Sequence, residues 1–254
     1  MPQPPRLPTR NELEEARRAI AGVAVRTPLA RYGGAPPPGA AAEIHLKLET
    51  AQPIRSFKIR GAANVMAHAP AEALAGGVWT ASAGNMAQGV AWCARERGIP
   101  CRVVVPDHAP RAKLDAIAAL GGSIEAVPFD AWWRAMLTHA HPGMRGLMVH
   151  PFADTRVMAG NGTIGLELAA DAPDLDAVLV PWGGGGLSLG IARALSFVSP
   201  RTRVYAVEVE TAAPLTASLA AGRPVTVSRT ATWIDGMGSD RVAADMWPLA
   251  AGLI

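Results

Sequence analysis

The sequence predicts an α/β fold of two open, twisted lobes whose parallel sheets face a cleft. Short apolar runs typical of buried strands alternate with helix-length segments, and this rhythm is typical of βαβ units. The alternation occurs between residues 77 and 140 and again between residues 157 and 209. In the second block a glycine-rich turn joins a strand to a helix, and such turns are common ligand sites in α/β proteins.

The first part of the chain contains a helix, a loop and a strand by pattern. Thr9 and Glu12 form a capping-box pair, and apolar residues at helical spacing predict a helix over residues 10–22. Residues 30–42 are rich in Gly, Pro and Ala, which indicates a loop. Alternating polar and apolar residues predict a strand over residues 43–49.

Two blocks of alternating strands and helices follow. The first block predicts strands at 77–81, 101–106 and 123–127, and helices at 86–97, 110–120 and 131–140. The second block predicts helices at 157–170 and 187–198, and strands at 177–181 and 203–209. We expect residues 75–150 to form a small lid lobe, with residues 1–74 and 151–254 together forming a large ligand-binding lobe.

Composition narrows the classes of function. Half of the 254 residues are apolar, and the net charge of +3 is scattered without a basic stripe for nucleic acid. No apolar run is long enough to span a bilayer, and the Pro-rich N-terminus does not resemble a secretion signal. Cys93 and Cys101 lack a CxxC partner, so we expect both to be buried small hydrophobes in a reducing cytoplasm. From the charge distribution and the apolar runs together we expect no membrane and no nucleic-acid partner.

The glycine-rich turn after the strand 177–181 favours a phosphate site. Glycines remove the Cβ atoms that block close approach, and a helix N-terminus presents free amides. A plain strand-to-helix turn is the alternative. A dinucleotide site is another, because Gly184, Gly186 and Gly190 form a variant of the dinucleotide fingerprint and Glu208 follows at the next strand. The glycines alone do not decide between these.

A lysine and a second amide-rich turn add to this pattern. Lys58 precedes an expected helix at 62–67, and a helix start disfavours a cation, so a Schiff base or a lowered pKa would relieve the conflict. A solvated surface lysine is the alternative. The turn at residues 82–88 also begins a helix and suits a carboxylate, although Ser82 or Asn85 acting as a simple helix cap would explain it equally.

Five segments together resemble a known family. They are Ser56-Phe57-Lys58-Ile59-Arg60-Gly61, Ser82-Ala83-Gly84-Asn85-Met86-Ala87-Gln88-Gly89, His150-Pro151-Phe152, Ala159-Gly160-Asn161-Gly162-Thr163-Ile164 and Gly183-Gly184-Gly185-Gly186-Leu187. In this order they resemble threonine dehydratases and serine racemases, which are pyridoxal-phosphate (PLP) enzymes of fold type II. The resemblance runs from about residue 10 to Gly238 and includes Ile234-Asp235-Gly236-Met237.

The resemblance implies a cofactor and its ligands. It implies that Lys58 holds PLP as a Schiff base and is the catalytic base. It implies cofactor contacts from Phe57, Lys58, Asn85, Gly183, Gly184, Gly185, Gly186 and Leu187. It implies a substrate carboxylate site at Ser82, Ala83, Gly84, Asn85, Met86 and Gln88. The implied reaction converts a β-hydroxy-α-amino acid, of the threonine or serine type, to a 2-oxo acid and ammonia in a homodimer.

Several residues depart from the family pattern. Ala83 stands where serine racemases carry a catalytic serine, which favours elimination over racemisation. Met86 and Trp132-Trp133 add apolar bulk. If they line the substrate side, the substrate carries a large apolar β-substituent, as in phenylserine, and if not, they are packing residues. We expect no metal site, with Glu208 as the one candidate cation ligand.

Two further interpretations stay open at this point. An NAD-dependent oxidoreductase would explain Gly184, Gly190 and Glu208 but leaves Lys58 and Asn85 without a role. The chain also stops at Ile254, before family members do, so the large lobe is expected to be incomplete at its C-terminal side. A truncated, non-catalytic chain of the same fold is therefore the third interpretation.

Overall fold

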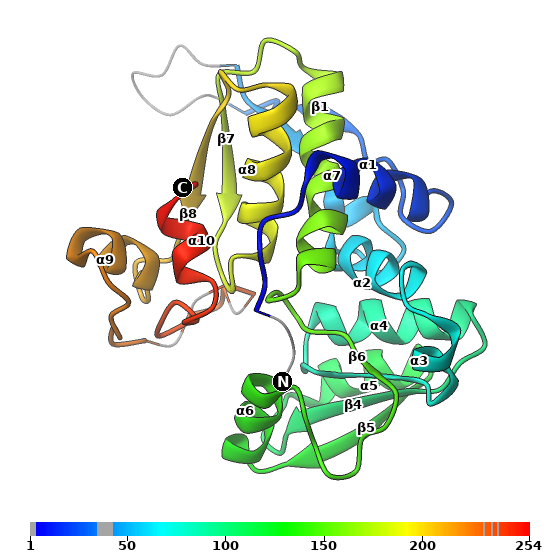
Figure 1. Ribbon diagram of the computed structural model, residues 1–254. Helices are drawn as coiled ribbons and strands as arrows, with labels where there is room; N and C mark the ends of the chain where they lie inside the picture. Colours follow the sequence, from blue (N-terminus) through cyan, green and yellow to red (C-terminus); the bar gives the residue numbers. More distant parts are fainter. Residues whose placement is uncertain (1–3, 35–42, 231, 235, 238) are drawn as a thin grey trace.

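The computed structural model describes residues 4–34, 43–230, 232–234, 236–237 and 239–254. Figure 1 shows two bodies, one around the strands β3 to β6 and one around β7 and β8, with the long helix α7 running through the second. Both sheets are parallel, which confirms the predicted fold class. Residues 35–42 of the predicted loop and Asp235 and Gly238 of the last motif lie outside the described residues.

The first sheet has the strand order β5-β4-β3-β6, and all of its pairs are parallel. Its strands are β3 (Val78–Ala81), β4 (Cys101–Pro106), β5 (Gly122–Val127) and β6 (Leu147–Met148). Its helices are α3 (Ala71–Ala75), α4 (Asn85–Glu96), α5 (Arg111–Ala119) and α6 (Phe129–Thr138). All of these elements lie within the range 75–150 except α3, of which only Ala75 falls inside it. The division into lobes stays a prediction.

Alternation along the strands places helices on both faces of this sheet. Val103 and Val105 belong to the apolar cluster that includes residues of α4 and α5. Trp79 and Val104 point the other way and pack with residues of α6. A strand buried on both sides is the normal state of a parallel sheet, and it explains why these strands are continuous apolar runs in the sequence.

The second sheet consists of β7 (Ala177–Pro181) and β8 (Arg203–Val207), joined through α8 (Gly186–Val198). One face packs against α8 and α7 (Thr155–Asp171) through Val178, Val180 and Val204. The opposite face carries Leu179, Tyr205 and Val207 as exposed side chains. The helices α9 (Pro214–Ala221) and α10 (Trp247–Ala251) follow (Figure 1).

The N-terminal segment corrects three boundaries. The capping box forms, because Thr9 Oγ1 accepts a hydrogen bond from the Glu12 amide, but α1 (Arg10–Ala19) ends early, before a turn at Gly22 with φ of 81°. β1 (Leu29–Arg31) lies partly in the predicted loop, where it pairs antiparallel with β2 (His45–Lys47). The strand predicted to reach residue 49 is therefore shorter, and a 3₁₀ turn, η1 (Glu49–Ala51), follows it.

Helix α7 is the common neighbour of α2 (Lys58–Ala67) and α8. A Cβ atom on Gly160 would collide with the carbonyl oxygen of Arg60 in α2. On the α8 side, a Cβ on Gly162 would lie 2.8 Å from the Gly190 carbonyl oxygen, and one on Gly165 would lie 2.9 Å from the Ala194 Cβ. Backbone therefore packs directly on backbone at both contacts, so glycine is required there.

Gly190→Ala is expected to destabilise the protein, because the new Cβ would collide with the Met158 carbonyl oxygen of α7. Overpacking of this kind costs about 1–3 kcal/mol of unfolding free energy, measurable by urea denaturation. Gly252→Ala is the matched control, since its Cβ would lie 3.5 Å from the nearest atom, the Pro248 carbonyl oxygen. Equal stability of the two variants would contradict the close packing of α7 and α8.

Candidate functional site

Lys58 is the first residue of α2, and its amine is withdrawn from solvent. Its Nζ donates a hydrogen bond to the Pro151 carbonyl oxygen at 2.8 Å and lies 5.3 Å from the centre of the Phe57 ring. Burial lowers the pKa of the Lys58 amine from 10.5 to about 8. The alternative of a solvated surface lysine is therefore wrong, and a larger fraction of this amine is unprotonated and nucleophilic near neutral pH than in an ordinary lysine.

The segment from His150 to Ala153 connects Lys58 to the glycine turn. Pro151 provides the acceptor for the amine, and the next residue, Phe152, lies against the glycines. A Cβ on Gly184 would collide with the Phe152 ring, and a Cβ on Gly186 would lie 2.8 Å from the Phe152 carbonyl oxygen. Two motifs far apart in the sequence thus meet through one short segment.

The glycine turn itself is fixed at the start of α8. Gly185 has φ of 88°, and a Cβ there would lie 2.6 Å from the Trp182 ring. Asn161 Nδ2, from α7, donates to the Gly186 carbonyl oxygen at 3.2 Å. The first amides of a helix have no partner within the helix, so α8 directs hydrogen-bond donors and its positive dipole end at this turn. The turn can hold a phosphate group.

The turn at residues 82–88 lies beside the lysine helix. Gly84 is the N-cap of α4 and makes no side-chain cap, so the simple capping role considered for Ser82 or Asn85 is wrong. Ser82 Oγ instead accepts from the Gly84 amide at 3.2 Å. A Cβ on Gly89 would lie 3.3 Å from the Lys58 carbonyl oxygen, so α4 starts close to Lys58. Asn85 is exposed at the first position of α4.

Some of the expected contact residues can offer only their backbone. Met86 is 1% exposed and its side chain belongs to the core around α2 and α4. The Leu187 side chain packs in the core beside β7. Trp132 and Trp133 are partly buried on α6 and packed on the first sheet. The Trp133 ring stacks on Phe129, and the Trp132 ring is tilted against it. The packing interpretation therefore holds for the Met86 side chain.

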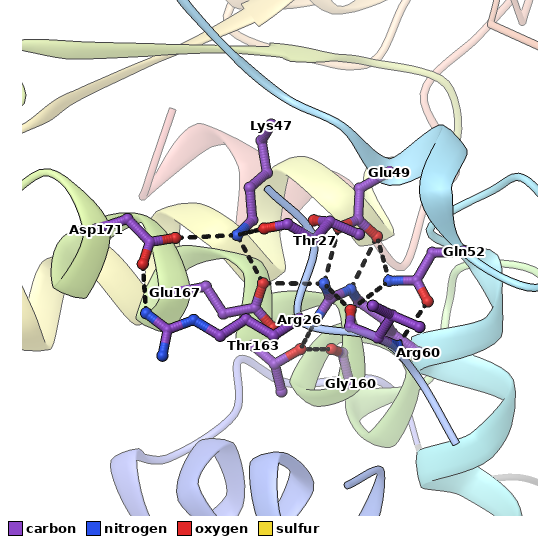
Figure 2. Close-up of polar contacts among 11 residues, drawn as sticks. Arg26, Thr27, Lys47, Glu49, Gln52, Arg60, Gly160, Thr163, Glu167 and Asp171 are labelled. Atoms are coloured by element: carbon purple, nitrogen blue, oxygen red, sulfur yellow. Dashed lines mark hydrogen bonds and ion pairs between the residues drawn. The ribbon is translucent and has the colours of Figure 1, made fainter. Parts of the chain in front are cut away.

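A buried ion-pair network fixes α2 two residues after the lysine (Figure 2). The Arg60 side chain is 1% exposed and lies between two carboxylates. It donates to Glu49 at 2.7 and 2.8 Å and to Glu167 of α7 at 2.6 and 3.0 Å. It also donates to Thr163 Oγ1 at 3.0 Å and to the Val25 carbonyl at 3.1 Å. Every direction of the guanidinium fork is satisfied.

The same network continues along α7 to its C-terminal end. Lys47 Nζ contacts Glu167 at 2.8 Å and Asp171 at 3.2 Å, and Asp171 also pairs with Arg26. Figure 2 shows these groups side by side with Arg60. A surface cavity of about 680 Å³ borders this end, lined by Arg26, Thr27, Pro28, Leu29, His45, Asp171 and Ala172. It contains none of the residues expected at the site.

Glu208 has a structural role in the fold. Its two carboxylate oxygens accept hydrogen bonds from the amides of Leu215 and Thr216 at 2.8 Å, which caps the first turn of α9. A role as a ribose or cation ligand stays a prediction. Cys93 and Cys101 are buried free thiols whose pKa values burial raises to about 12, which confirms their role as small hydrophobes. The described residues contain no group of three or more His, Cys, Asp or Glu arranged for a metal.

Comparison with known proteins assigns the family. Residues 20–254 match the model of the family described as pyridoxal-phosphate dependent enzyme. The chain belongs to this family. L-threonine ammonia-lyase of Thermotoga maritima is 41% identical over 231 residues, which are 90% of this chain and 57% of that protein. A biosynthetic L-threonine dehydratase of Burkholderia multivorans is 41% identical over 213 residues, 81% of this chain and 42% of that protein.

Solved structures agree with the family at the level of the fold. Maize serine racemase superposes with a TM-score of 0.84 at 29% identity, covering 98% of this chain and 77% of that one. Tomato (Solanum lycopersicum) threonine deaminase isoform 2 gives a TM-score of 0.80 at 32% identity, covering 98% and 70%. The chain spans about half the length of the curated relatives it matches. Among the described residues no helix is both long and apolar enough to cross a membrane.

The residues present fit PLP. An aldehyde cofactor needs a nucleophilic amine, and Lys58 offers one with a pKa of about 8. A phosphate group needs amide donors without obstructing side chains, and the glycine turn at α8 offers them. The segment at Pro151 and Phe152 brings these two features together. The sequence predicted both the Lys58 amine and the glycine turn, but it gave no role to His150 or to the carboxylates around Arg60.

Arg60→Met is expected to destabilise the protein by roughly 3–5 kcal/mol, because it leaves the partly buried Glu49 carboxylate without its cation and Glu167 with Lys47 alone. Urea denaturation measures the loss. Arg111→Met is the control, since it breaks an ion pair with Asp115 in which the arginine is 87% exposed, and it should cost at most about half a kcal/mol. If Arg60→Met lost as little unfolding free energy as the control, the stabilising role of the ion-pair network around Arg60 would be contradicted.

The Lys58 amine should also shape stability against pH. Its folded pKa of about 8 lies below the unfolded value of 10.5, so the unfolded chain binds more protons between these values. The free energy of unfolding therefore rises from about pH 8 to about pH 10.5 by up to roughly 3 kcal/mol, relative to Lys58→Met, which lacks the group. Urea titrations of the cofactor-free proteins at several pH values measure this. If the unfolding free energies of wild type and Lys58→Met changed with pH in parallel, the lowered pKa of the buried Lys58 amine would be disproved.

Proposed function

We propose that this chain is the catalytic part of a PLP-dependent dehydratase, a lyase that converts a β-hydroxy-α-amino acid to a 2-oxo acid and ammonia. The observation that carries the proposal is the low-pKa Lys58 amine, held on the Pro151 carbonyl next to the glycine turn. The names of the relatives, L-threonine ammonia-lyase and L-threonine dehydratase, support a substrate of the threonine or serine type.

The site residues would divide the work between them. Lys58 would hold the cofactor, with Phe57 beside it and Asn85 near the ring, while the amides from Gly183 to Leu187 would bind the phosphate. Pyridoxal phosphate, when bound, supplies an electron sink for the negative charge that develops at the substrate Cα. The Lys58 amine would accept the Cα proton at Nζ. The amides of residues 82–88 would hold the substrate carboxylate and orient the Cα–H bond.

Elimination is favoured over racemisation at this site. Racemisation needs a proton donor on each side of the Cα atom, and Lys58 provides one. Ala83 has no titratable side chain on the turn that would hold the substrate carboxylate. With a single proton carrier, loss of the β-hydroxyl group is the outcome that the described residues support.

A bulky β-substituent is a finer part of the proposal. Trp132 and Trp133 lie on α6, in the same apolar cluster as Phe152, which contacts the glycine turn. An aromatic surface there would suit a substrate such as phenylserine. Met86 no longer supports this idea, because its side chain lies in the core. The preference therefore rests on the two tryptophans.

The proposed function also includes a lid and an assembly. Residues 75–150 would move against the large lobe, formed by 1–74 and 151–254, and shield the reacting carbanion from water. Closed symmetric dimers are the commonest assemblies of soluble enzymes, and a cytoplasmic homodimer is proposed here.

The test of the function is the visible absorption spectrum with added PLP, combined with an assay for 2-oxo acid. Wild type should develop a Schiff-base band and release 2-oxo acid from a β-hydroxy amino acid, and Lys58→Ala should do neither. Lys113→Ala removes a lysine on α5 that is not among the proposed site residues, and this variant should still form the Schiff-base band. A band that survives in Lys58→Ala would sink the proposal.

Substrate choice is decided in the same assay. Phenylserine should have a higher kcat/KM than threonine if the tryptophans face the substrate, and Trp132→Ala and Trp133→Ala should each narrow that difference. A clear preference for threonine would be consistent with the dehydratase proposal but would refute the proposal of a bulky β-substituent. A thermal shift with NAD and none with PLP would instead revive the oxidoreductase interpretation.

A further inference from the structure

His150 occupies a position that the proposed reaction does not yet use. It is 4% exposed, and its Nδ1 accepts hydrogen bonds from the amides of Phe152 at 3.2 Å and of Ala153 at 2.7 Å. Pro151, between these residues, directs its carbonyl oxygen at Lys58 Nζ. We propose that His150 is a positioning residue for the Lys58 amine, acting through the Pro151 carbonyl. This deepens the proposed function and rests on it.

The argument starts from the chemistry of the turn. Proline has no amide hydrogen and a fixed φ, so the carbonyl oxygen is the only polar group residue 151 offers, and its direction depends on the residues around it. One ring nitrogen of His150 binds the two amides that follow, which closes the turn from inside. A nitrogen that accepts two hydrogen bonds carries no proton, so the ring proton resides on Nε2. The carbonyl then has one orientation.

Two other rings pack against the His150 ring. His139, which follows α6, stacks on it at 4.7 Å between ring centres, and Phe152 meets its edge at the same distance. The backbone of Met136 in α6 also acts on the ring and raises the pKa of His150, against the larger effect of burial. The small-lobe helix, the lysine and the glycine turn are therefore connected through this one imidazole.

The charge state of the ring is settled by its surroundings. The charged and titratable groups that face it are His139 after α6, Asp154 at the start of α7 and Lys58 from α2. Burial is the main cause that lowers the pKa of His150 to about 3, so the ring is neutral near neutral pH. Replacing it with a neutral amide therefore removes no charge, and an effect on Lys58 reports geometry.

Three variants separate the acceptor from the ring. His150→Asn places an amide oxygen where Nδ1 lies and retains the acceptor for the two amides. His150→Gln places its amide group one bond further out, near Nε2, and leaves those amides without a partner. His139→Asn removes the stacked ring but leaves the acceptor, and asparagine tolerates the φ of 54° found at this residue.

The experiment follows Lys58 without and with cofactor. Acetic anhydride labelling of the cofactor-free protein across pH, read by peptide mass spectrometry, gives the pKa of Lys58, with Lys47 and Lys113 as internal references. The second readout is the rate at which added PLP forms a Schiff base with Lys58, releasing water, followed by absorbance. Melting temperatures of all variants are recorded alongside.

We expect His150→Gln to lower the labelling midpoint of Lys58, because the ammonium form loses its acceptor within a site that stays buried. Schiff-base formation should slow by roughly tenfold or more, as misplaced reacting groups do. His150→Asn and His139→Asn should match the wild type in both readouts.

Other results would overturn the role of His150. An unchanged midpoint in His150→Gln would show that the carbonyl needs no support, and a rise toward the ordinary lysine value would show that the segment has opened to water. If His150→Gln does not fold, the test passes to His150→Asn. A folded His150→Asn in which the labelling midpoint of Lys58 is shifted would then refute the positioning role of His150. Failure of the wild type to react with PLP refutes the proposed function, while the labelling comparison still decides the role of His150.

Discussion

The buried pairing of Arg60 with Glu49 and Glu167 is the constraint on which the candidate site depends. The three charges come from α2, from the 3₁₀ turn before it and from α7, so their alignment fixes the axis of α2 against α7. Lys58 is the first residue of α2, so the placement of this helix also fixes the position of the Lys58 backbone. An interaction of this kind adds little net stability over an apolar replacement, but its geometry admits one arrangement of the helices.

Helix α7 extends this arrangement to the glycine turn. Its glycines meet the backbone of α2 and of α8, and Asn161 between them donates to the Gly186 carbonyl. The amine and the glycine turn are thus placed by a single rigid element. The remaining link is the segment before α7, in which Pro151 and Phe152 contact the two functional features directly.

The sequence was sufficient for the fold class, because the fold class depends on local patterns, and the same patterns predict a site whose residues stay predictions. Strand and helix alternation, the glycine turn and the position of Lys58 at a helix start are all visible within short windows. Misplaced boundaries arose where tertiary contacts override the pattern, as in β1, a strand within a Gly- and Pro-rich region that forms because β2 pairs with it. The lobe limits and the individual ligand roles remain predictions.

Long-range partners were the part that sequence could not provide. Nothing local marks Glu49 and Glu167 as partners of Arg60, or the amides of α9 as partners of the Glu208 oxygens. Met86 was considered as a substrate contact because it adds apolar bulk beside the turn, yet its side chain fills the core. His150 stood in a quoted motif, but its two amide contacts follow from the path of the turn.

The dependence on α7 also bears on the order in which the chain folds. The lysine helix is made early in synthesis, whereas the helix that follows the glycine turn becomes available only after α7 and β7 have emerged. Contacts between such distant segments close late, because loop closure must be completed before they stabilise anything. A nascent chain that ends before α8 therefore has its reactive lysine but no place for a phosphate, and the ability to bind cofactor arises in one late step.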